Sequence, residues 1–437
     1  MQKRTLINEV KNSKGELILY GWVHELRDLA NIKFIILRDF SGVIQCAIKK
    51  DSKAWDNFSP LTLESVIEIK GKVKDANVKS EEVTIKNFEI EVQEINLINK
   101  AENLPIQVVL KDKSIQTDLS KRLDYRFLDT RKKEISAIFK IRSSIYKNII
   151  NFFHENGFTI INTPKITTIG LESGAESFQV NYFDKKAVLA QSPQFYKQMF
   201  VLGGFERVLE IGQVYRAEKS HTNRHLTEFT GVDFEMGFIK DEDDIMDIIE
   251  EMLKYVIEKV KEERKQELEI LNVQLKIPKK IPRIPMSELK KILAKKGKKL
   301  KEDDDLDADA EQLAGEYSLK EFNEEFIFVT NYPYNKRPFY HMKPINDSKG
   351  TRSFDLLFNG VEIATGAQRE HRLEILKAQA KEKGIKIPKE YEEIFRYGAI
   401  PHGGVGFGLD RITQRMLNLD NVREALLLPR DTERLTP

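Results

Sequence analysis

The sequence contains very little cysteine and no long apolar run. Cys46 is the only cysteine among 437 residues, so the chain cannot form an internal disulfide or a zinc site built from cysteines. No stretch approaches the roughly 18 apolar residues of a membrane span, and the N-terminal residues lack the apolar core of a signal peptide. We therefore expect a protein of the reducing cytoplasm that does not enter a membrane.

The sequence also lacks an excess of charge of either sign. Lys and Arg total 71 against 69 Asp and Glu, which gives a formal net charge of +2 although 32% of the residues are charged. This balance excludes a protein that binds nucleic acid over its whole surface, but it allows a local basic patch. With 41% hydrophobic residues, the chain is long enough for two or three globular domains with a large core.

The first hundred residues are rich in short β-like segments. Five runs of β-branched and aromatic residues, separated by turn signals such as Ser41-Gly42, predict strands over 17–22, 33–37, 43–48, 66–73 and 83–92. Five short strands favour a small barrel, for which the OB-fold is a common solution, although a generic β-sandwich has the same pattern.

After residue 132 the pattern changes to long amphipathic helices. Apolar spacing predicts one helix over 134–156, which Gly157 ends, and another over 241–266. Residues 276–325 hold three prolines and runs of lysine and aspartate, and we interpret them as a peripheral insertion whose charges face solvent. The predicted organisation is a β domain over 1–102, a linker over 103–132 and a larger domain over 133–437.

A β-hairpin is predicted over residues 353–366, because Asn359-Gly360 is the strongest two-residue hairpin signal. In that hairpin Asp355 and Glu362 lie on one face as diagonal neighbours. Two such carboxylates repel each other unless a cation lies between them, and their hard oxygens suit Mg²⁺ with phosphate oxygens completing the shell. From the hairpin alone, one solvated carboxylate and one paired with arginine is the alternative interpretation.

A short helix is predicted after Ser192-Pro193, because serine is a good N-cap and proline fits the first helical position. The helix ends at the glycine pair 203–204 and places Lys197 in its second turn. A lone lysine on a helix is usually exposed, so this segment does not indicate a site by itself.

A strand, a charged loop and a return strand are predicted over 209–238. Arg216 and Arg224 in the loop can each bind a phosphate bidentately, which makes the loop a candidate cradle for a polyphosphate. Phe229 offers a flat face for a base, and it equally fits a position in the core.

Closely spaced glycines precede a predicted helix over 412–417. They do not form a dinucleotide or P-loop motif, because a preceding βαβ unit and the P-loop lysine are both missing. Arg411, at the start of that helix and beside glycine backbone, is placed to bind a terminal phosphate.

These segments, in this order, resemble the archaeal type of aspartyl-tRNA synthetase within class IIb of the aminoacyl-tRNA synthetases. The helix from Glu134 with Thr163-Pro164 resembles motif 1, residues 216–235 resemble motif 2, and 406–411 resemble motif 3. The resemblance covers essentially the whole chain. It implies an α+β fold in which an N-terminal OB-fold β-barrel binds the anticodon and a class II catalytic domain follows, with an antiparallel sheet flanked by helices.

The resemblance also implies a reaction. L-aspartate would attack the α-phosphate of ATP to give aspartyl-adenylate, and tRNA(Asp) would then accept the aspartyl group, with positioning and electrostatics sufficing for catalysis. Arg216 would stabilise charge at the α-phosphate, Arg411 would bind the γ-phosphate, and these two would be the catalytic residues.

Further roles follow from the same resemblance. Phe229 would stack on adenine beside Glu218, and the full set of implied ATP ligands is Arg216, Ala217, Glu218, Arg224, His225, Leu226, Phe229, Glu362, Gly408, Leu409, Asp410 and Arg411. The implied aspartate ligands are Glu172, Gln194, Lys197, Arg216, Thr365 and Arg369. The implied Mg²⁺ ligands are Asp355, Glu362 and Thr365.

Charge in the implied amino-acid pocket favours aspartate. An aspartate side chain needs a cationic pocket because burying it unpaired is costly, and Lys197 and Arg369 match the family's ligands for it. An asparagine enzyme would not need Lys197, and a lysine enzyme would need acids there. Thr365 stands where the family often has serine, and it keeps the hydroxyl.

Four residues of the β domain match positions that contact the anticodon: His24, Arg27, Phe34 and Gln45. Phe34 would stack on a base and Gln45 would hydrogen-bond to it, although core packing is the alternative role for Phe34. Family members restricted to tRNA(Asp) tend to have tryptophan in place of His24. Histidine there is typical of enzymes that also charge tRNA(Asn), whose product a tRNA-dependent amidotransferase would convert to asparaginyl-tRNA.

Motif 1 implies a homodimer, and other protein classes share parts of the pattern. A relative of asparagine synthetase would use the same adenylate chemistry but would lack the β domain. An asparaginyl-tRNA synthetase would share the whole architecture. A non-catalytic tRNA-binding paralogue would have lost some of Arg216, Glu362 and Arg411, all of which are present.

Overall fold

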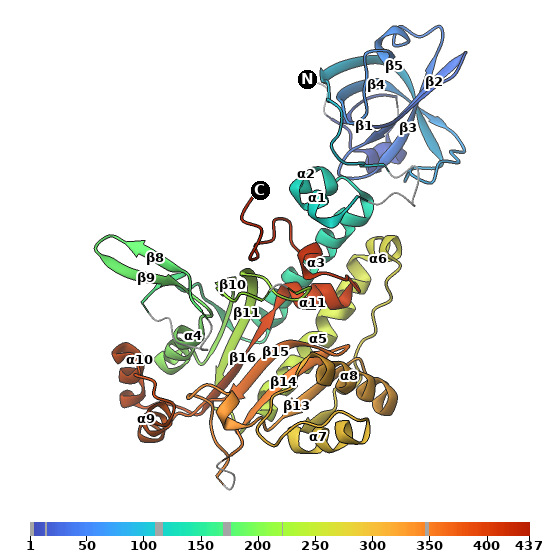
Figure 1. The fold of residues 1–437 in the computed structure, drawn as a ribbon. Coiled ribbons are helices and arrows are strands. Elements are labelled where there is room, and N and C mark those ends of the chain that lie inside the picture. The colour runs from blue at the N-terminus through green and yellow to red at the C-terminus, as the bar shows by residue number, and fades with distance from the viewer. Residues whose placement is uncertain (1–3, 14, 110–116, 169–175, 221, 346–348) are drawn as a thin grey trace. The chain divides into compact units, whose positions relative to one another are not determined.

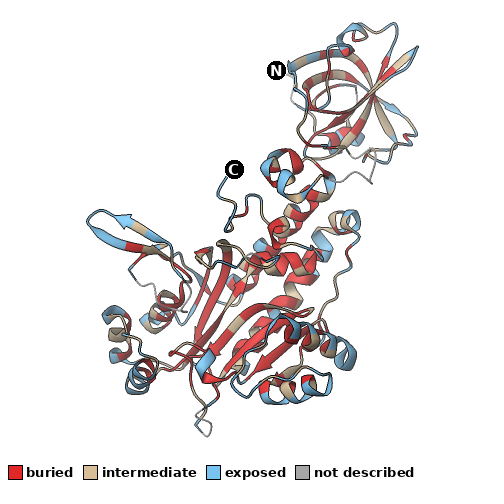
Figure 2. Cartoon of the chain, in the orientation of Figure 1, coloured by how far each residue is buried: buried red, intermediate tan, exposed pale blue. Residues whose placement is uncertain are grey.

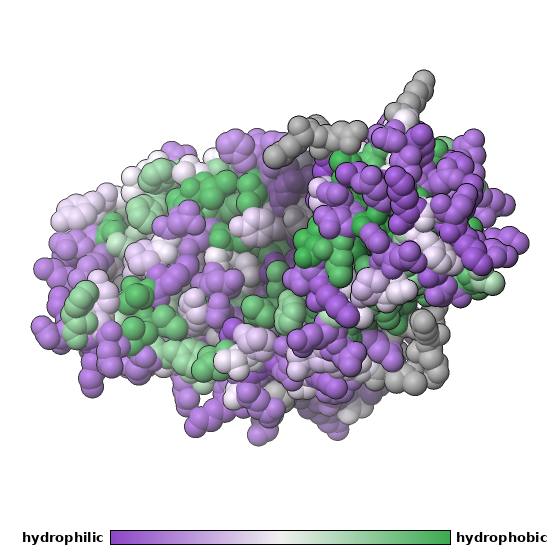
Figure 3. Space-filling view, turned by 90° about the horizontal axis from the view of Figure 1, so that it is seen from above, coloured by the Kyte–Doolittle hydropathy of each residue, from purple (hydrophilic) through white to green (hydrophobic). Residues whose placement is uncertain are grey.

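The computed structural model describes residues 4–13, 15–109, 117–168, 176–220, 222–345 and 349–437 (Figure 1). By its contacts the chain divides into two compact units, residues 1–132 and 133–437. The face shown in Figure 3 carries mainly hydrophilic side chains with smaller hydrophobic patches between them, as expected for a chain with 32% charged residues.

The first unit contains a closed five-stranded barrel with the strand order β1-β2-β3-β5-β4. Its strands are β1 (Glu16–Asp28), β2 (Ile32–Arg38), β3 (Val43–Lys49), β4 (Val66–Asp75) and β5 (Phe88–Asn99). Only β3 and β5 pair in parallel among these strands. The predicted barrel is therefore present.

The last predicted strand, 83–92, is wrong at its N-terminal end, because β5 begins at Phe88. Val83 is buried, but it packs with Ile36 and Val78 in a small cluster of its own rather than in a strand. Val83 is thus an apolar residue of the loop that packs on β2, which explains why the sequence pattern predicted a strand that begins too early.

Cys46 points into the barrel core and is fully buried. Burial raises the pKa of its thiol, so the thiolate that reacts or binds metal is not formed. The single cysteine therefore contributes packing.

Two short helices follow the barrel within the same unit, α1 (Leu119–Asp124) and α2 (Arg126–Asp129). Asp118 caps α1 by accepting from the N–H groups of Ser120 and Lys121. Arg131, just after α2, donates to Glu64 of the barrel at 2.7 Å, and this ion pair fastens the helices to the barrel.

The second unit is built on an eight-stranded sheet with the order β12-β13-β14-β15-β16-β11-β10-β6. Its strands are β6 (Thr159–Ile160), β10 (Arg207–Tyr215), β11 (Glu228–Gly237), β12 (Arg283–Pro285), β13 (Phe326–Thr330), β14 (Ser353–Phe358), β15 (Val361–Gln368) and β16 (His402–Gly408). Pairing is antiparallel except at the two ends, β12–β13 and β6–β10. The sheet is largely buried (Figure 2).

Long helices pack against this sheet and complete its core. Helix α3 (Lys133–Glu155) corresponds to the helix predicted over 134–156, and α5 (Asp243–Glu263) packs beside it. The second predicted helix, 241–266, is interrupted at Arg264, and α6 (Lys265–Leu271) follows. Among the described helices, none combines the length and apolar character needed to cross a bilayer.

The segment 276–325 takes part in the fold of this unit. Strand β12 extends the sheet at one end, and α7 (Met286–Lys295) and α8 (Ala308–Phe322) cover that end (Figure 1). Many of its charged side chains are exposed, as predicted, but Glu311 on α8 is buried.

The remaining elements surround the sheet. Helix α4 (Gln194–Phe200) begins one residue later than predicted, with Pro193 as its N-cap residue, and ends in a π-helical turn over Val201–Phe205. A three-stranded sheet contains β7 (Ile166–Thr167), β9 (Lys185–Leu189) and β8 (Gln179–Tyr182). The last helices are α9 (Leu373–Glu382), α10 (Lys389–Ile394) and α11 (Leu409–Met416).

Candidate active site

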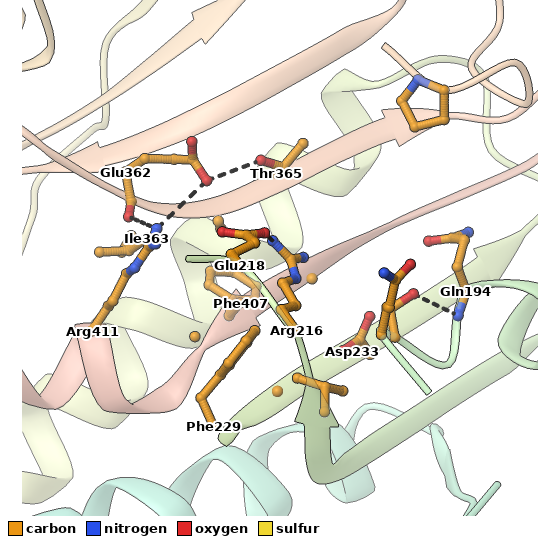
Figure 4. A pocket seen from close by; sticks show the side chains of 18 of the residues that line it. Gln194, Arg216, Glu218, Phe229, Asp233, Glu362, Ile363, Thr365, Phe407 and Arg411 are labelled. Carbon is orange, nitrogen blue, oxygen red and sulfur yellow. Dashed lines mark hydrogen bonds and ion pairs between the residues drawn. The ribbon is translucent and has the colours of Figure 1, made fainter. Parts of the chain in front are cut away.

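A cavity of about 680 Å³ lies in the second unit, over the strands β10, β11, β15 and β16. Its lining includes predicted ligands from all three motif-like segments. Figure 4 shows Glu362, Thr365 and Arg411 gathered at one end, Gln194 and Asp233 at the other, and Arg216 between them. One continuous space therefore connects the predicted phosphate and amino-acid ends.

Arg216 lies just after β10, with its guanidinium 5.5 Å from the centre of the Phe229 ring. Its Nη1 atom is 3.8 Å from Glu218, and both side chains line the cavity. Phe229 is half-buried on β11 and also lines the cavity, so it presents a flat face there rather than filling the core. An arginine stacked on an aromatic ring keeps its donors available for a phosphate.

Arg224, His225 and Leu226 line the same end of the cavity. Burial and the neighbouring arginines 411 and 224 lower the pKa of His225, so the imidazole is mainly neutral at pH 7. Gly408, Asp410 and Arg411 reach the cavity from β16 and α11, whereas Ala217 and Leu409 are not among its lining residues.

The hairpin between β14 and β15 has the predicted register, with Phe358 opposite Val361 and Leu357 opposite Glu362. A bulge follows, and it brings Asp355 opposite Thr365. The Thr365 hydroxyl donates to Glu362 Oε1 at 3.3 Å. The sequence thus predicted the turn correctly, and the bulge explains how the hydroxyl joins the two carboxylates.

Asp355 is buried, and its Oδ2 accepts from Arg337 at 2.6 Å. Burial raises the pKa of Asp355, Arg337 opposes this rise, and the nearby charge of Glu362 adds to it. Among the residues that the structure describes, none donates a hydrogen bond within 3.5 Å to its buried Oδ1, although the hydroxyls of Thr365 and Tyr332 also interact with this carboxyl. An unsatisfied carboxylate oxygen next to a second carboxylate fits a hard divalent cation.

The predicted metal ligands alone supply few donors. Within the described part of the chain, no three or more His, Cys, Asp or Glu side chains converge on one point. Two carboxylates with a hydroxyl leave most of an octahedral shell to water and phosphate oxygens, which is how Mg²⁺ is commonly held beside a nucleotide.

The amino-acid end is a buried cluster of two cations and two carboxylates. Arg369 donates to both oxygens of Glu235, at 2.9 and 3.2 Å, and to Gln194 Oε1 at 3.3 Å. Although burial acts to raise it, Arg369 and Lys197 lower the pKa of Glu235 overall. Arg369 and Gln194, two of the predicted aspartate ligands, both line the cavity.

Lys197 lies behind the cavity wall rather than in it. Its ammonium is 2.9 Å from Asp233 Oδ1, 2.9 Å from the carbonyl of Val405 and 3.5 Å from Glu235 Oε2, and the side chain is 1% exposed. Asp233 does line the cavity. The structure therefore connects Lys197 to the cavity through a carboxylate.

Besides Arg337, three site residues had not been assigned roles from the sequence. Asp233 and Glu235 share a face of β11 with Phe229, and that alternation was a usable signal. His341 lines the cavity and its Nε2 is 2.9 Å from Arg369 Nη1. Burial and the charge of Arg369 lower the pKa of His341 well below its usual value, so it is a neutral acceptor. The predicted ligand Glu172 lies outside the described residues.

The predicted anticodon residues lie on the barrel of the first unit. Arg27 and Phe34 are directly opposite on β1 and β2, and Gln45 follows on β3 with the same orientation. Phe34 is half-exposed, whereas Arg27 pairs with Glu25 at 2.9 Å and Gln45 donates to Glu89 at 2.8 Å.

His24 is buried beside this face. Its Nδ1 is 2.8 Å from Arg38 Nη1, and its Nε2 is 3.5 Å from the carboxylate of Glu82. The imidazole therefore packs behind this face of the barrel and is not exposed on it.

Comparison with known proteins finds a matching family model for each of the two units. A family model described as tRNA synthetases class II (D, K and N) matches residues 118–432, and one described as an OB-fold nucleic acid binding domain matches 17–98. The "Aspartate--tRNA(Asp/Asn) ligase" of Aeropyrum pernix is 42% identical over 100% of both chains. The "Aspartate--tRNA(Asp) ligase" of Thermococcus kodakarensis is 42% identical over 95% of each.

Solved structures of similar shape agree with these matches. The asparaginyl-tRNA synthetase of Pyrococcus horikoshii complexed with asparaginyl-adenylate superposes with a TM-score of 0.92, at 31% identity and over 100% of both chains. The aspartyl tRNA synthetase of Entamoeba histolytica has a TM-score of 0.90 at 31% identity, covering 100% of this chain and 93% of that one.

Proposed function

The chain belongs to the class II tRNA synthetases of the aspartate, lysine and asparagine group, among the archaeal aspartate--tRNA ligases, and we propose that it attaches L-aspartate to tRNA through an aspartyl-adenylate. The observation that carries this proposal is one cavity with a cation-bearing amino-acid end at Arg369, two arginines, 224 and 411, at the other end, and Arg216 between them. Such a cavity can hold an amino acid at one end and the triphosphate of ATP at the other, with the α-phosphate between them.

The chain's own residues account for catalysis by position and charge. Arg216 lies between the two ends, where the α-phosphate of ATP would meet the aspartate carboxylate. Its guanidinium stabilises the charge that develops on the phosphate oxygens, and Phe229 orients it. Pyrophosphate leaves toward Arg224 and Arg411. No protein nucleophile is required.

Asp355, Glu362 and Thr365 would hold Mg²⁺ at the phosphate end, where the ion would neutralise phosphate charge. The unsatisfied oxygen of Asp355 is the observation that supports this assignment. Arg337 donates to Oδ2 of the same carboxylate, and this bond fixes the orientation of the carboxyl group and thus of Oδ1.

Selection of aspartate follows from the charges of the amino-acid end. Lys197 and Arg369 balance Asp233 and Glu235, so the empty cluster is neutral. The ammonium of the substrate is attracted to Asp233 at the cavity wall, and its side-chain carboxylate is attracted to Arg369. An asparaginyl-tRNA synthetase remains the alternative, since a solved enzyme of that specificity has the same fold.

Exchange of pyrophosphate into ATP tests the amino-acid assignment. We expect exchange with purified protein, ATP, Mg²⁺ and L-aspartate, and exchange lower by about a hundredfold or more with L-asparagine or L-lysine, because a missing or reversed charge is strongly rejected by a buried ion cluster. Exchange that depends on asparagine or lysine, or its absence with all three, would contradict the proposal.

Recognition of tRNA is assigned to the barrel. Replacing Phe34 with alanine should raise the KM for tRNA(Asp) about tenfold, because base–aromatic stacking contributes about 1–3 kcal/mol per base. Exchange without tRNA should be unchanged. Phe40, which is 69% exposed on the same barrel, is the matched control, and its alanine variant should behave as the wild type. Equal effects in aminoacylation kinetics of both variants would remove Phe34 from the interface.

We also propose tRNA(Asn) as a second substrate, with a tRNA-dependent amidotransferase acting on the product. The names of the similar archaeal enzymes include both the Asp/Asn and the Asp specificity, and His24 supports the wider one. Aminoacylation of purified tRNA(Asn) decides between them, since the absence of charging at rates near those for tRNA(Asp) would contradict it. Because such an enzyme would act in protein synthesis, we propose a cytoplasmic location.

A homodimer is part of the same proposal. Strand β6 forms one end of the eight-stranded sheet, and its Ile160 is 44% exposed. Ile166 of β7, an edge strand of the three-stranded sheet, is also exposed. Exposed apolar residues along a sheet edge are suited to pairing with another chain.

A further inference from the structure

Glu311 connects three separate segments of the active site. It lies in the first turn of α8 and is buried, and its Oε2 accepts from Arg224 Nη1 at 2.8 Å and from the backbone N–H of Glu362 at 3.0 Å. Arg224 comes from the loop between β10 and β11, and Glu362 stands at the start of β15. One carboxylate thus holds a phosphate-end arginine and a metal-end residue together.

The peptide at Glu362 is held from both sides. Its N–H is bound by Glu311, and its carbonyl accepts from Arg411 Nη1 at 3.0 Å. On the preceding turn, Arg415 Nη2 donates to the carbonyl of Asn359 at 3.0 Å. Helices α8 and α11 therefore fix the hairpin from two directions.

The position of Glu311 is itself set by close packing of α8 on the hairpin. A Cβ at Gly315, one helical turn after Glu311, would lie 2.4 Å from the backbone nitrogen of Gly360. Gly360 also has φ +74°, which glycine adopts without strain. Asp307 caps the helix by accepting from the Ala310 N–H at 2.9 Å, and a carboxylate in the first turn is favoured by the helix dipole. A rigid helix thus carries this carboxylate into the site.

We propose that Glu311 is a positioning residue for the triphosphate end of the cavity. It directs Arg224 at the phosphates and fixes Glu362, and it does not touch the substrate itself. Arg224 is 29% exposed and lies on a loop, so without this partner its side chain would sample many rotamers. A guanidinium has five donors, so Arg224 can keep Glu311 and still bind a phosphate. The inference rests on the proposed function, which assigns Arg224 and Glu362 to ATP and Mg²⁺.

The test is the Glu311→Gln variant in ATP–pyrophosphate exchange, with Glu316→Gln as the matched control. Glu316 lies on the same helix and is exposed. For Glu311→Gln we expect the KM for ATP to rise about tenfold, the scale of one charge-assisted hydrogen bond, while the KM for aspartate stays within about twofold. Glu316→Gln should match the wild type. If the glutamine variant does not fold, Glu311→Asp is the alternative, because it keeps the negative charge but its shorter side chain no longer reaches Arg224. The same rise in the KM for ATP, without a rise for aspartate, is expected.

Coupling to Arg224 gives the second measurement. In an Arg224→Ala background, Glu311→Gln should change the KM for ATP clearly less than it does in the wild type, since part of its effect acts through Arg224. Full additivity, equal rises for ATP and aspartate, or an unchanged KM for ATP would overturn the inference. Failure of the wild type to exchange with aspartate would instead contradict the proposed function, so the two failures are distinguishable.

Discussion

Replacing Arg216 with alanine should lower the rate of aspartyl-adenylate formation by about a thousandfold, the scale typical of arginines that stabilise a transferring phosphoryl group. Arg216 is placed between the two ends of the cavity, where its guanidinium stacks on Phe229 and lies 3.8 Å from Glu218. Its contribution grows as charge develops, so the loss should appear in kcat more than in the KM for either substrate.

Single-turnover formation of the adenylate measures this loss directly. Arg207→Ala is a suitable control, because Arg207 starts the same strand and is exposed at its far end. The control should retain its rate within about twofold, as is usual for an exposed residue away from the site. An Arg216→Ala enzyme that keeps more than about a tenth of the wild-type rate would remove Arg216 from the reaction, because loss of even one stabilising donor typically costs more.

Local chemistry explains which parts of the site could be predicted. The turn at Asn359-Gly360 is dictated by two residues, so the register that pairs Leu357 with Glu362 followed from the sequence. The bulge after it falls just before Ala364, where β15 begins to pair with β16, and no short sequence pattern encodes it. The late start of β5 was also not predictable from a local pattern, because Val83 packs in a small apolar cluster with Ile36 and Val78 and not in a strand.

Partners distant in sequence explain what the sequence did not reveal. Lys197 was interpreted as a direct ligand, but its carboxylate partner is on β11 and its carbonyl partner, Val405, is on β16. Glu311 lies in a segment whose lysine and aspartate runs indicate solvent exposure, and only tertiary packing turns that one carboxylate inward. Burial of a charge is decided by what folds against it, so composition along the chain cannot identify it.

The Lys197→Met variant should bind aspartate about a hundredfold more weakly and should also be less stable. Methionine fills the space of the lysine stem but leaves Asp233 without its 2.9 Å partner. Breaking one side of a buried ion pair typically costs about 3–5 kcal/mol, and the cluster then carries a net negative charge that repels the aspartate side chain. The KM for aspartate should rise far more than that for ATP, which thermal unfolding and exchange kinetics on the same preparation would show.

The double variant Lys197→Met with Asp233→Asn separates the two effects. Removing both members of a buried pair is less costly than removing one, so much of the thermal stability should return. Aspartate binding should not return, because both the pocket charge behind the wall and the carboxylate that faces the substrate ammonium are then missing. Full recovery of the aspartate KM in the double variant, or equal rises for aspartate and ATP in the single one, would show that Lys197 supports only the fold. The expected result makes Lys197 a determinant of amino-acid selection that acts through Asp233, without entering the cavity.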